Sequence, residues 1–495
     1  MMASCDFRDS RRRTWLSSRT LAEQVLSRAA GAPLHGGNSI RLLIDARENY
    51  AAWLDRLEGA RRTIHMEMYI IHEDETGREF ADVLMRKARE GVRVRLLHDW
   101  MGGLFKTSGR FWGALREAGV DVRCFNSPRW DGPLGWISRN HRKVIVVDGR
   151  TAFVTGLCIG QVWRGFPDRG IDPWRDTGVE IRGPAVADIE TAFSDVWAVA
   201  GAPLPEDEIP DRENTETAGD IDLRVIATAP NTAGLYRLDN LVAALARRSL
   251  WLSDAYFVGM SSYVQALRSA ALDGVDVRLL VPGSTDLPLL RAISRAGYQP
   301  LLEAGVRVFE WNGSMMHAKT AVADGMWARV GSTNLNIASW MGNYELDVAV
   351  ENADFARSME AMFLRDLENS TEVVLGRRNR VSLAESRPRR RHGEPPVHAG
   401  RLGRAGAGTL RIGYSVGAAL TEHRDLGHAE ARVTAAAGLL FLCMALAGLL
   451  RPLWLIAPLS LFCAWLSVAL FVRTFKLILR KLTGHDPPDG AGRAR

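Results

Sequence analysis

An internal duplication limits the fold of this chain more than any other feature of its sequence. Between residues 39 and 375, three short stretches occur twice in the same order, at offsets of 186, 183 and 186 residues. A repeated order at a nearly constant spacing indicates two copies of one structural unit. Two similar halves that pack face to face place equivalent residues around one pseudo-twofold axis, as in a symmetric dimer. The repeated stretches are Ala60–Arg62 with Ala246–Arg248, Gly91–Leu97 with Gly274–Leu280, and Ala118–Val122 with Ala304–Val308.

Each copy alternates amphipathic helical stretches with short apolar runs of strand length. Helical spacing is found at Glu79–Glu90 and Ser261–Leu272, and apolar runs at Ile64–Ile71 and Leu250–Val258. This alternation is typical of an α/β sandwich. We therefore predict an α/β fold in two halves with pseudo-twofold symmetry. The halves cover residues 39–205 and 223–375, and a Pro- and acid-rich linker at 206–222 joins them.

The charge of the chain is unevenly distributed. The 495 residues carry a formal net charge of +6, but residues 376–411 contain ten arginines and two glutamates, so this segment alone contributes +8 and the rest −2. A protein groove that follows a nucleic-acid backbone is expected to be basic. We therefore expect no nucleic-acid partner for the two halves. The five cysteines form no CxxC pair, which argues against a zinc ribbon or a disulfide framework.

Two uncharged apolar runs near the C-terminus have the length of membrane helices. Residues 433–450 and 453–472 would span about 27 and 30 Å as helices, close to the hydrocarbon thickness of a bilayer. The alternative is a buried helical hairpin of a soluble domain, but neither run has a polar stripe for a soluble face. We predict a transmembrane hairpin over 433–472. The flanking basic residues place both of its ends, and the body before it, on the cytoplasmic side of the inner membrane.

Three further segments flank these parts. Residues 1–38 are predicted to form a helical or interfacial segment, with a short helix that starts near Thr20 and stops at Gly31. Residues 376–428 form an arginine-rich linker, which either lies against anionic headgroups or is a solvated tether. Residues 473–495 form a basic cytoplasmic tail.

The chemistry of the chain is duplicated as well. His141, Lys143 and Asp148 obey the pattern HxKxxxxD, and His317, Lys319 and Asp324 obey it again in the second half. A histidine and a lysine two positions apart share one face of a strand and can meet one ligand. A single histidine before a buried strand is more often structural, but a seven-residue pattern at corresponding positions of two halves favours a joint site.

Two imidazoles and two ammonium groups around one axis form a phosphate site that requires no metal and no cofactor. The lysines would neutralise a phosphodiester and its developing charge. One imidazole can attack phosphorus while the other protonates the leaving alkoxide. Because the two rings must then hold opposite protonation states, each requires a carboxylate partner.

A short turn with small residues follows each motif. In the second half it is Gly331-Ser332-Thr333-Asn334, whose hydroxyl and amide groups are candidate phosphate donors. In the first half it is Thr155-Gly156-Leu157-Cys158, so Cys158 stands where the second half has Asn334. Since a thiol donates hydrogen bonds poorly, we expect an asymmetric phosphate cradle.

These motifs resemble those of the phospholipase D superfamily over residues 39–375. The strings Trp174–Pro184 and Asn343-Tyr344-Glu345 are similar to its bacterial cardiolipin synthase branch. The resemblance implies a ping-pong transfer through a phosphohistidine, with phosphatidylglycerol as donor and a second lipid alcohol as acceptor. It implies His141 as nucleophile, His317 as general acid, and Asp176 and Glu345 as orienting carboxylates. Asp148 and Asp324 belong to the catalytic motifs, although they are also suited to fixing tight turns.

Other functions are open to the same architecture. Water in place of the lipid alcohol would make the protein a phospholipase D-type hydrolase, and a nuclease is a weaker alternative. Apolar and aromatic residues on the loop Asn126–Asn140, together with Trp163, Phe166 and Trp174, either admit acyl chains or pack over the core of the protein.

Overall fold

The computed structural model describes residues 23–127, 138–208, 215–376 and 380–383, with isolated positions between 457 and 468. Most of the predicted hairpin at 433–472, most of the arginine linker, the start of the chain and the centre of the loop at 126–140 lie outside the described residues. Among the described residues, no helix is both long and apolar enough to cross a membrane.

Sixteen strands of the described residues form one mixed sheet in the order β16-β15-β11-β10-β9-β12-β13-β14-β8-β1-β7-β6-β5-β2-β3-β4. Read outward from the β8–β1 pair, the first seven strands on each side follow the same order, which is the predicted pseudo-twofold arrangement. The second half adds β15 and β16 at its outer edge. The bounds are β1 His35–Ile44, β2 Thr63–Met68, β3 Arg93–Asp99, β4 Asp121–Phe125, β5 Lys143–Val147, β6 Thr151–Thr155, β7 Thr177–Arg182, β8 Ile221–Thr228, β9 Ser249–Ser253, β10 Asp276–Pro282, β11 Arg307–Trp311, β12 Thr320–Ala323, β13 Trp327–Gly331, β14 Glu345–Glu351, β15 Ser370–Gly376 and β16 Arg380–Leu383.

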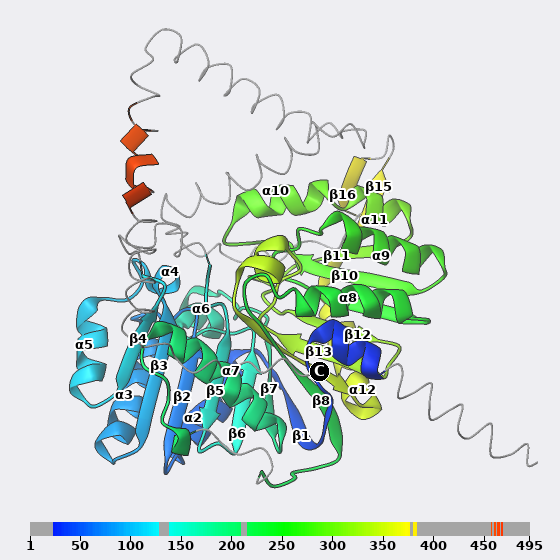
Figure 1. Cartoon of the computed structure of the whole chain (residues 1–495). Helices are drawn as coiled ribbons and strands as arrows, with labels where there is room; N and C mark the ends of the chain where they lie inside the picture. Colours follow the sequence, from blue (N-terminus) through cyan, green and yellow to red (C-terminus); the bar gives the residue numbers. More distant parts are fainter. Residues whose placement is uncertain are drawn as a thin grey trace, which may run out of the picture. The chain divides into compact units, whose positions relative to one another are not determined.

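Helices cover the strands of both halves (Figure 1). Those of the first half are α2 Asp45–Glu58, α3 Glu75–Arg89, α4 Trp100–Gly103, α5 Gly109–Glu117, α6 Gln161–Arg164 and α7 Ala185–Ala200. Those of the second half are α8 Gly234–Leu245, α9 Ser261–Leu272, α10 Pro288–Ala296, α11 Gln299–Glu303 and α12 Ala353–Glu368. The helix predicted at Ser261–Leu272 is confirmed. β1 begins at His35, before the predicted start of the first half at residue 39. β16 lies inside the segment predicted as arginine-rich linker, and it pairs with β15.

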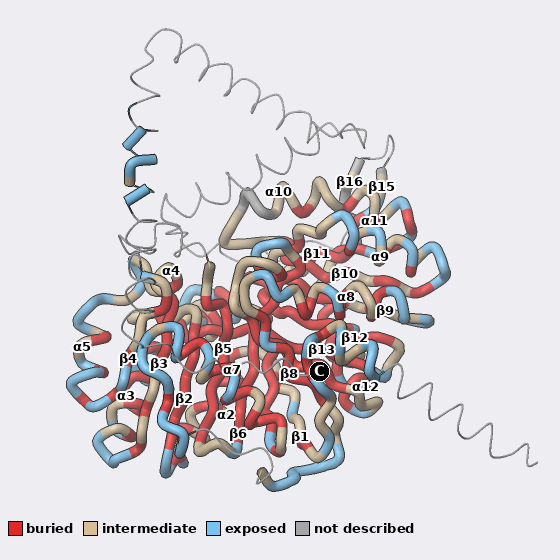
Figure 2. Tube along the Cα trace, viewed as in Figure 1, coloured by how far each residue is buried: buried red, intermediate tan, exposed pale blue. Residues whose placement is uncertain are grey.

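The hydrophobic core of the described residues has three large parts and two smaller ones. One lies between the first half of the sheet and its helices, around Trp53 and Phe80, and a second lies in the other half, around Leu252 and Leu267. The third is shared, because aliphatic side chains of β5, β6 and β7 pack against those of β13 and β14. Figure 2 shows the strands buried along most of their length in both halves. The halves therefore meet through an apolar face, which fixes the strands that lead into the two histidine motifs.

The chain before β1 ends in a short helix. Residues 23–30 are helical, and Gly31 has φ 68°, the left-handed conformation that commonly terminates a helix. The predicted stop at Gly31 is confirmed, while the predicted start at Thr20 lies outside the described residues.

Candidate active site

The two histidines are paired with carboxylates of the opposite half. His141 Nδ1 lies 2.9 Å from the carboxylate of Glu345, at the start of β14. His317 Nδ1 lies 2.6 Å from the carboxylate of Asp176, just before β7. All four residues are buried, with exposed fractions of 9% or less. This crossed pairing puts residues from both halves into one site.

The backbone is crossed in the same way. The amide of His141 donates to the carbonyl of Tyr344 at 2.9 Å, and the amide of His317 donates to the carbonyl of Arg175 at 2.7 Å. Each of these carbonyls belongs to the residue before the partner carboxylate. Each histidine is therefore held to its partner carboxylate by the backbone as well as by the side chains.

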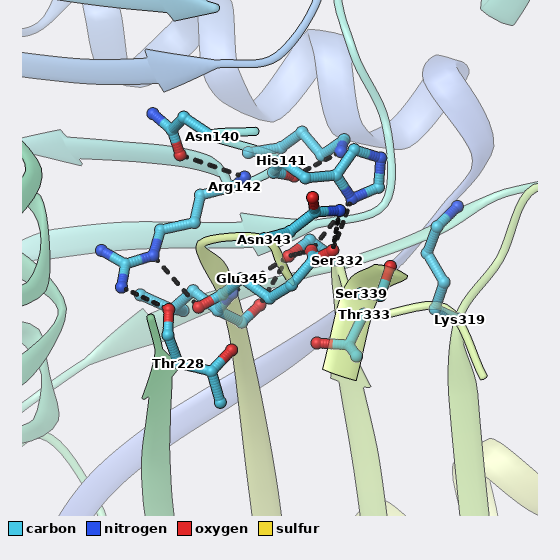
Figure 3. A network of polar contacts seen from close by, with 12 residues as sticks. Asn140, His141, Arg142, Thr228, Lys319, Ser332, Thr333, Ser339, Asn343 and Glu345 are labelled. Carbon is cyan, nitrogen blue, oxygen red and sulfur yellow. Dashed lines mark hydrogen bonds and ion pairs between the residues drawn. The ribbon is translucent and has the colours of Figure 1, made fainter. Parts of the chain in front are cut away.

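Three donors converge on Glu345, as Figure 3 shows. Besides His141, the Ser332 hydroxyl donates to Oε2 at 2.6 Å and the Asn343 side-chain amide donates to Oε1 at 3.2 Å. Ser332, predicted as a phosphate donor, thus has its hydroxyl hydrogen directed to the carboxylate in this structure. These bonds fix the orientation of the carboxylate and, through it, the imidazole.

The two lysines are buried beside the histidines. The ammonium groups of Lys143 and Lys319 donate to the carbonyls of His141 and His317, and Lys319 Nζ lies 3.1 Å from His317 Nδ1. Lys143 Nζ also lies over the ring of Tyr69, 5.2 Å from its centroid. Burial lowers the pKa of both ammonium groups, to about 8 for Lys143. Two cations in a dry site favour an anionic ligand.

Burial and the lysines also set the titration of the two rings. Burial, with the charge of Lys319, lowers the pKa of His317 to about 3, against the opposing effect of Asp176. Burial, with Lys143 and Lys319, lowers the pKa of His141, against the opposing effect of Glu345. Although burial raises the pKa of the Glu345 carboxyl, His141, Lys143 and Ser332 outweigh it and hold that pKa below its usual range. Without substrate, both rings are neutral at pH 7.

Asp148 and Asp324 lie far from the histidines. Each follows its histidine by seven residues, a separation of about 20 Å along an extended chain. The Asp148 carboxylate accepts hydrogen bonds of 2.7–3.2 Å from the backbone amides of residues 61–63. Asp324 accepts bonds of 2.7–3.2 Å from those of residues 247–249. Both also have φ near 55°, as a tight hairpin turn requires. Their geometry is therefore that of turn-fixing residues.

The two small-residue turns differ as the sequence indicates. Asn334 is 4% exposed, and its Oδ1 has no hydrogen-bond partner among the described residues. Cys158, at the corresponding position, is 1% exposed and belongs to the apolar core of the first half. Burial raises the pKa of the Cys158 thiol, against the opposing charge of Lys143, so the thiol is neutral. Of these two turns, only the one in the second half carries an amide side chain.

Two groups around the histidines were not assigned from the sequence. Arg142 points to the opposite face from His141, where its guanidinium donates to the carbonyls of Glu345, Ala192 and Thr228 at 2.6–3.1 Å. The sequence shows an arginine directly before the apolar strand β5, but it does not show which carbonyls that arginine contacts. Tyr69 packs edge-on against His141, with ring centroids 4.9 Å apart.

Among the described residues, more aromatic rings lie near His317 than near His141. The rings of Trp163, Trp174 and Tyr256 lie 5.9, 5.6 and 6.0 Å from the His317 ring. Trp163 is buried and Trp174 is half-buried, so they pack beside the site.

Sequence comparison relates this chain to cardiolipin synthases of several bacteria. A family model described as "Cardiolipin synthase, PLD-like domain" matches residues 53–197 and 242–367. A cardiolipin synthase of Alkalihalophilus pseudofirmus is 33% identical over 360 residues, which cover 72% of this chain and 70% of the relative. Cardiolipin synthase A of Pseudomonas putida is 31% identical over 380 residues, covering 73% and 77%.

A solved structure shares the fold. The phosphatidylserine synthase of Haemophilus influenzae superposes with a TM-score of 0.56 at 15% identity, and the match covers 70% of this chain and 91% of that one. At this identity the likeness concerns the fold alone. The family match, the relatives and the duplicated α/β sheet agree, and this chain therefore belongs to the cardiolipin synthase family, phosphatidyltransferases of the phospholipase D superfamily.

Proposed function

We propose that this protein transfers a phosphatidyl group from phosphatidylglycerol to a second lipid alcohol through a phosphohistidine. The observation that carries the proposal is the crossed pair of histidines and carboxylates, with one buried lysine beside each ring. Such a site offers two imidazoles, one to form a covalent bond to phosphorus and one to move a proton.

The first half-reaction cleaves the donor. His141 Nε2 forms a bond to phosphorus, and the bond from phosphorus to the glycerol oxygen breaks. His317 takes up a proton when the anionic donor binds beside it and delivers that proton to the leaving alkoxide, so glycerol departs as a neutral alcohol. Glu345 and Asp176 hold the Nδ1 side of their rings, which directs both Nε2 atoms to the reacting group.

The second half-reaction runs in reverse with a new alcohol. His317, now neutral, takes the proton of the acceptor hydroxyl as its oxygen bonds to phosphorus, and the bond from phosphorus to His141 breaks. Lys143 and Lys319 stabilise the charge on the phosphoryl oxygens in both steps, with Asn334 as a further donor. A dry site favours a lipid alcohol over water as acceptor.

The proposal extends to the membrane. An enzyme whose substrates are phospholipids must work at a lipid surface, and the apolar runs at 433–472 have the length to anchor it there. The arginine-rich segment 376–428 and the tail 473–495 have the charge to meet anionic headgroups on the cytoplasmic side. We divide the catalytic body into halves at 39–205 and 223–375, with 206–222 between them.

Product analysis tests the function. Purified full-length protein with phosphatidylglycerol vesicles should release one glycerol for each cardiolipin formed, and a chelator should leave the rate unchanged. Rapid acid quenching should trap radiolabel from the phosphatidyl donor on a histidine. Phosphatidic acid as the main product would instead identify the protein as a phospholipase D-type hydrolase.

A further inference from the structure

The turn after β3 holds an aromatic side chain in solvent. Phe105 is 78% exposed, and its backbone has φ 59°, in the left-handed region. For a bulky residue this conformation is a genuine outlier, because the Cβ atom crowds the following carbonyl. A backbone outlier that displays an apolar ring to water indicates a role outside folding.

Backbone hydrogen bonds hold this turn in place. The amides of Lys106 and Thr107 donate to the carbonyl of Gly103 at 3.1 and 3.2 Å, and the amide of Glu73 donates to the carbonyl of Lys106 at 3.1 Å. The Thr107 hydroxyl donates to the carbonyl of Ile71. Phe105 therefore points into solvent from a turn that hydrogen bonds hold in one conformation.

The turn lies beyond the carboxyl end of β3, on the side of the sheet where the site is. Strands β2 and β3 run parallel, with Met68 opposite His98, and Met68 also pairs with Lys143 of β5. The carboxyl end of β3, from which α4 and Phe105 continue, is thus on the same side of the sheet as the end of β5 that begins with Lys143, just after His141. One strand, β2, lies between β3 and β5 (Figure 1). Gly102 of α4 packs against the carbonyl of Tyr69, where an added Cβ would come within 1.8 Å of the oxygen.

The neighbours of Phe105 suit a lipid surface. Lys106 and Arg110 are exposed on the same connection, so the apolar ring is flanked by positive charge. The second half contributes Ile337, 46% exposed, three residues beyond the Gly331–Asn334 turn. Each half thus shows an apolar side chain near its end of the site. An aromatic ring beside basic residues is typical of segments that enter the headgroup region of an anionic bilayer.

We propose that Phe105, with Lys106, is a membrane-contact element of the catalytic body that seats the mouth of the site on an anionic phospholipid bilayer. The inference rests on the proposed function, since it takes a phospholipid surface as the partner. The ring enters the acyl region, the lysine meets a headgroup phosphate, and a substrate molecule reaches the site without leaving the bilayer.

A photo-crosslinking experiment tests the contact independently of catalysis. Full-length protein with p-benzoylphenylalanine in place of Phe105 is reconstituted in vesicles of phosphatidylglycerol and phosphatidylethanolamine and irradiated. The matched control carries the same probe at Leu272, which is 70% exposed but lies before the amino end of β10, at the opposite edge. Lipid adducts at 105 and none at 272 are expected. Protein adducts at 105, from another protein or a second copy, or equal lipid labelling at both positions, would overturn the proposal.

Kinetics give a second, functional readout. Phe105→Ser should reduce kcat/KM on long-chain phosphatidylglycerol vesicles about tenfold, from the lost burial of one aromatic ring, and leave the rate on monomeric short-chain phosphatidylglycerol unchanged. Phe105→Leu should restore most of the loss, and Leu272→Ser should have no effect. Phe105→Gly should unfold at a higher temperature than Phe105→Ser, since only glycine is free in the left-handed region. Equal losses on vesicles and monomers would reject the contact, whereas crosslinking without any transfer would reject only the proposed function.

Discussion

The two halves of the active site keep the same reacting groups but support them differently. In the second half, Ser332 donates to the long carboxylate of Glu345. In the first half, the corresponding position is Gly156, where an added Cβ would come within 2.2 Å of the shorter carboxylate of Asp176. Serine with glutamate and glycine with aspartate fill the same space. A duplicated site can therefore diverge in its supporting residues, provided that each replacement compensates another.

A second pair of positions follows the same rule. Gly331 leaves room for Asp347, since an added Cβ would lie 2.3 Å from its carboxylate. Gly178 leaves room for Asn49 and Thr155, since an added Cβ would lie 2.1 Å from the Asn49 side-chain oxygen and 2.8 Å from the Thr155 hydroxyl. Small and large residues have exchanged sides between the halves. The histidines and lysines have no such exchange, which is consistent with both being needed at one phosphorus atom.

The largest loss of activity should come from replacing either histidine. His141→Ala and His317→Ala should each reduce cardiolipin formation by a factor of about 10³ or more, since each removes a covalent or proton-transfer step. With a donor whose leaving group needs no proton, such as a p-nitrophenyl phosphodiester, His317→Ala should still form a phosphoenzyme and His141→Ala should not. A phosphoenzyme in His141→Ala would reverse the two roles.

The next largest loss of activity is expected for the two carboxylates that hold the histidines. Asp176→Asn and Glu345→Gln should each lower kcat by about 10³-fold, as loss of the orienting carboxylate does in other histidine sites. The compensation between the halves can be tested by copying the first half into the second. Glu345→Asp and Ser332→Gly should each impair turnover, and the double variant should recover part of the loss. Losses that simply add in the double variant would show that the two positions are independent.

The pH dependence should reveal the unlike surroundings of the two rings. One ring must carry a proton and the other must be neutral, and this state is most populated between the two pKa values. Because the pKa of each ring is lowered, to about 3 for His317, kcat/KM should peak below pH 6.5 and then fall about tenfold per pH unit. Asp176→Asn should shift the peak to lower pH, since Asp176 raises the pKa of His317. A maximum above pH 7.5 would contradict this account.

Much of this arrangement was predictable from the sequence. The offsets of the repeats gave two halves, and the spacing of His141 and Lys143 gave a shared face. The resemblance to the phospholipase D superfamily supplied Asp176 and Glu345, and the structure places their carboxylates beside His317 and His141. Their pairing with the opposite half required the fold, because it depends on how β7 and β14 approach each other across the shared core.

Other features were not accessible from patterns. Ser332 was predicted to meet phosphate, yet its hydroxyl is directed to Glu345, which is a matter of side-chain geometry. The same limit applies to Arg142, whose role depends on three carbonyls that are distant in sequence. Phe105 carries no sequence signal, since only its backbone conformation and exposure distinguish it.

The smallest effect on kcat is expected at Cys158, which stands where the second half has Asn334. Cys158→Ala should change kcat by less than about threefold, because a buried neutral thiol is a poor hydrogen-bond donor to phosphate. Asn334→Ala, at the matching position, should lower kcat by about 10²-fold, as expected for loss of a preorganised donor. Melting temperatures of both variants would separate packing losses from catalytic ones. If Cys158→Ala lowered kcat as much as Asn334→Ala at equal stability, both halves would contribute to phosphate binding. The two halves would then differ in the residue at this position but not in its role.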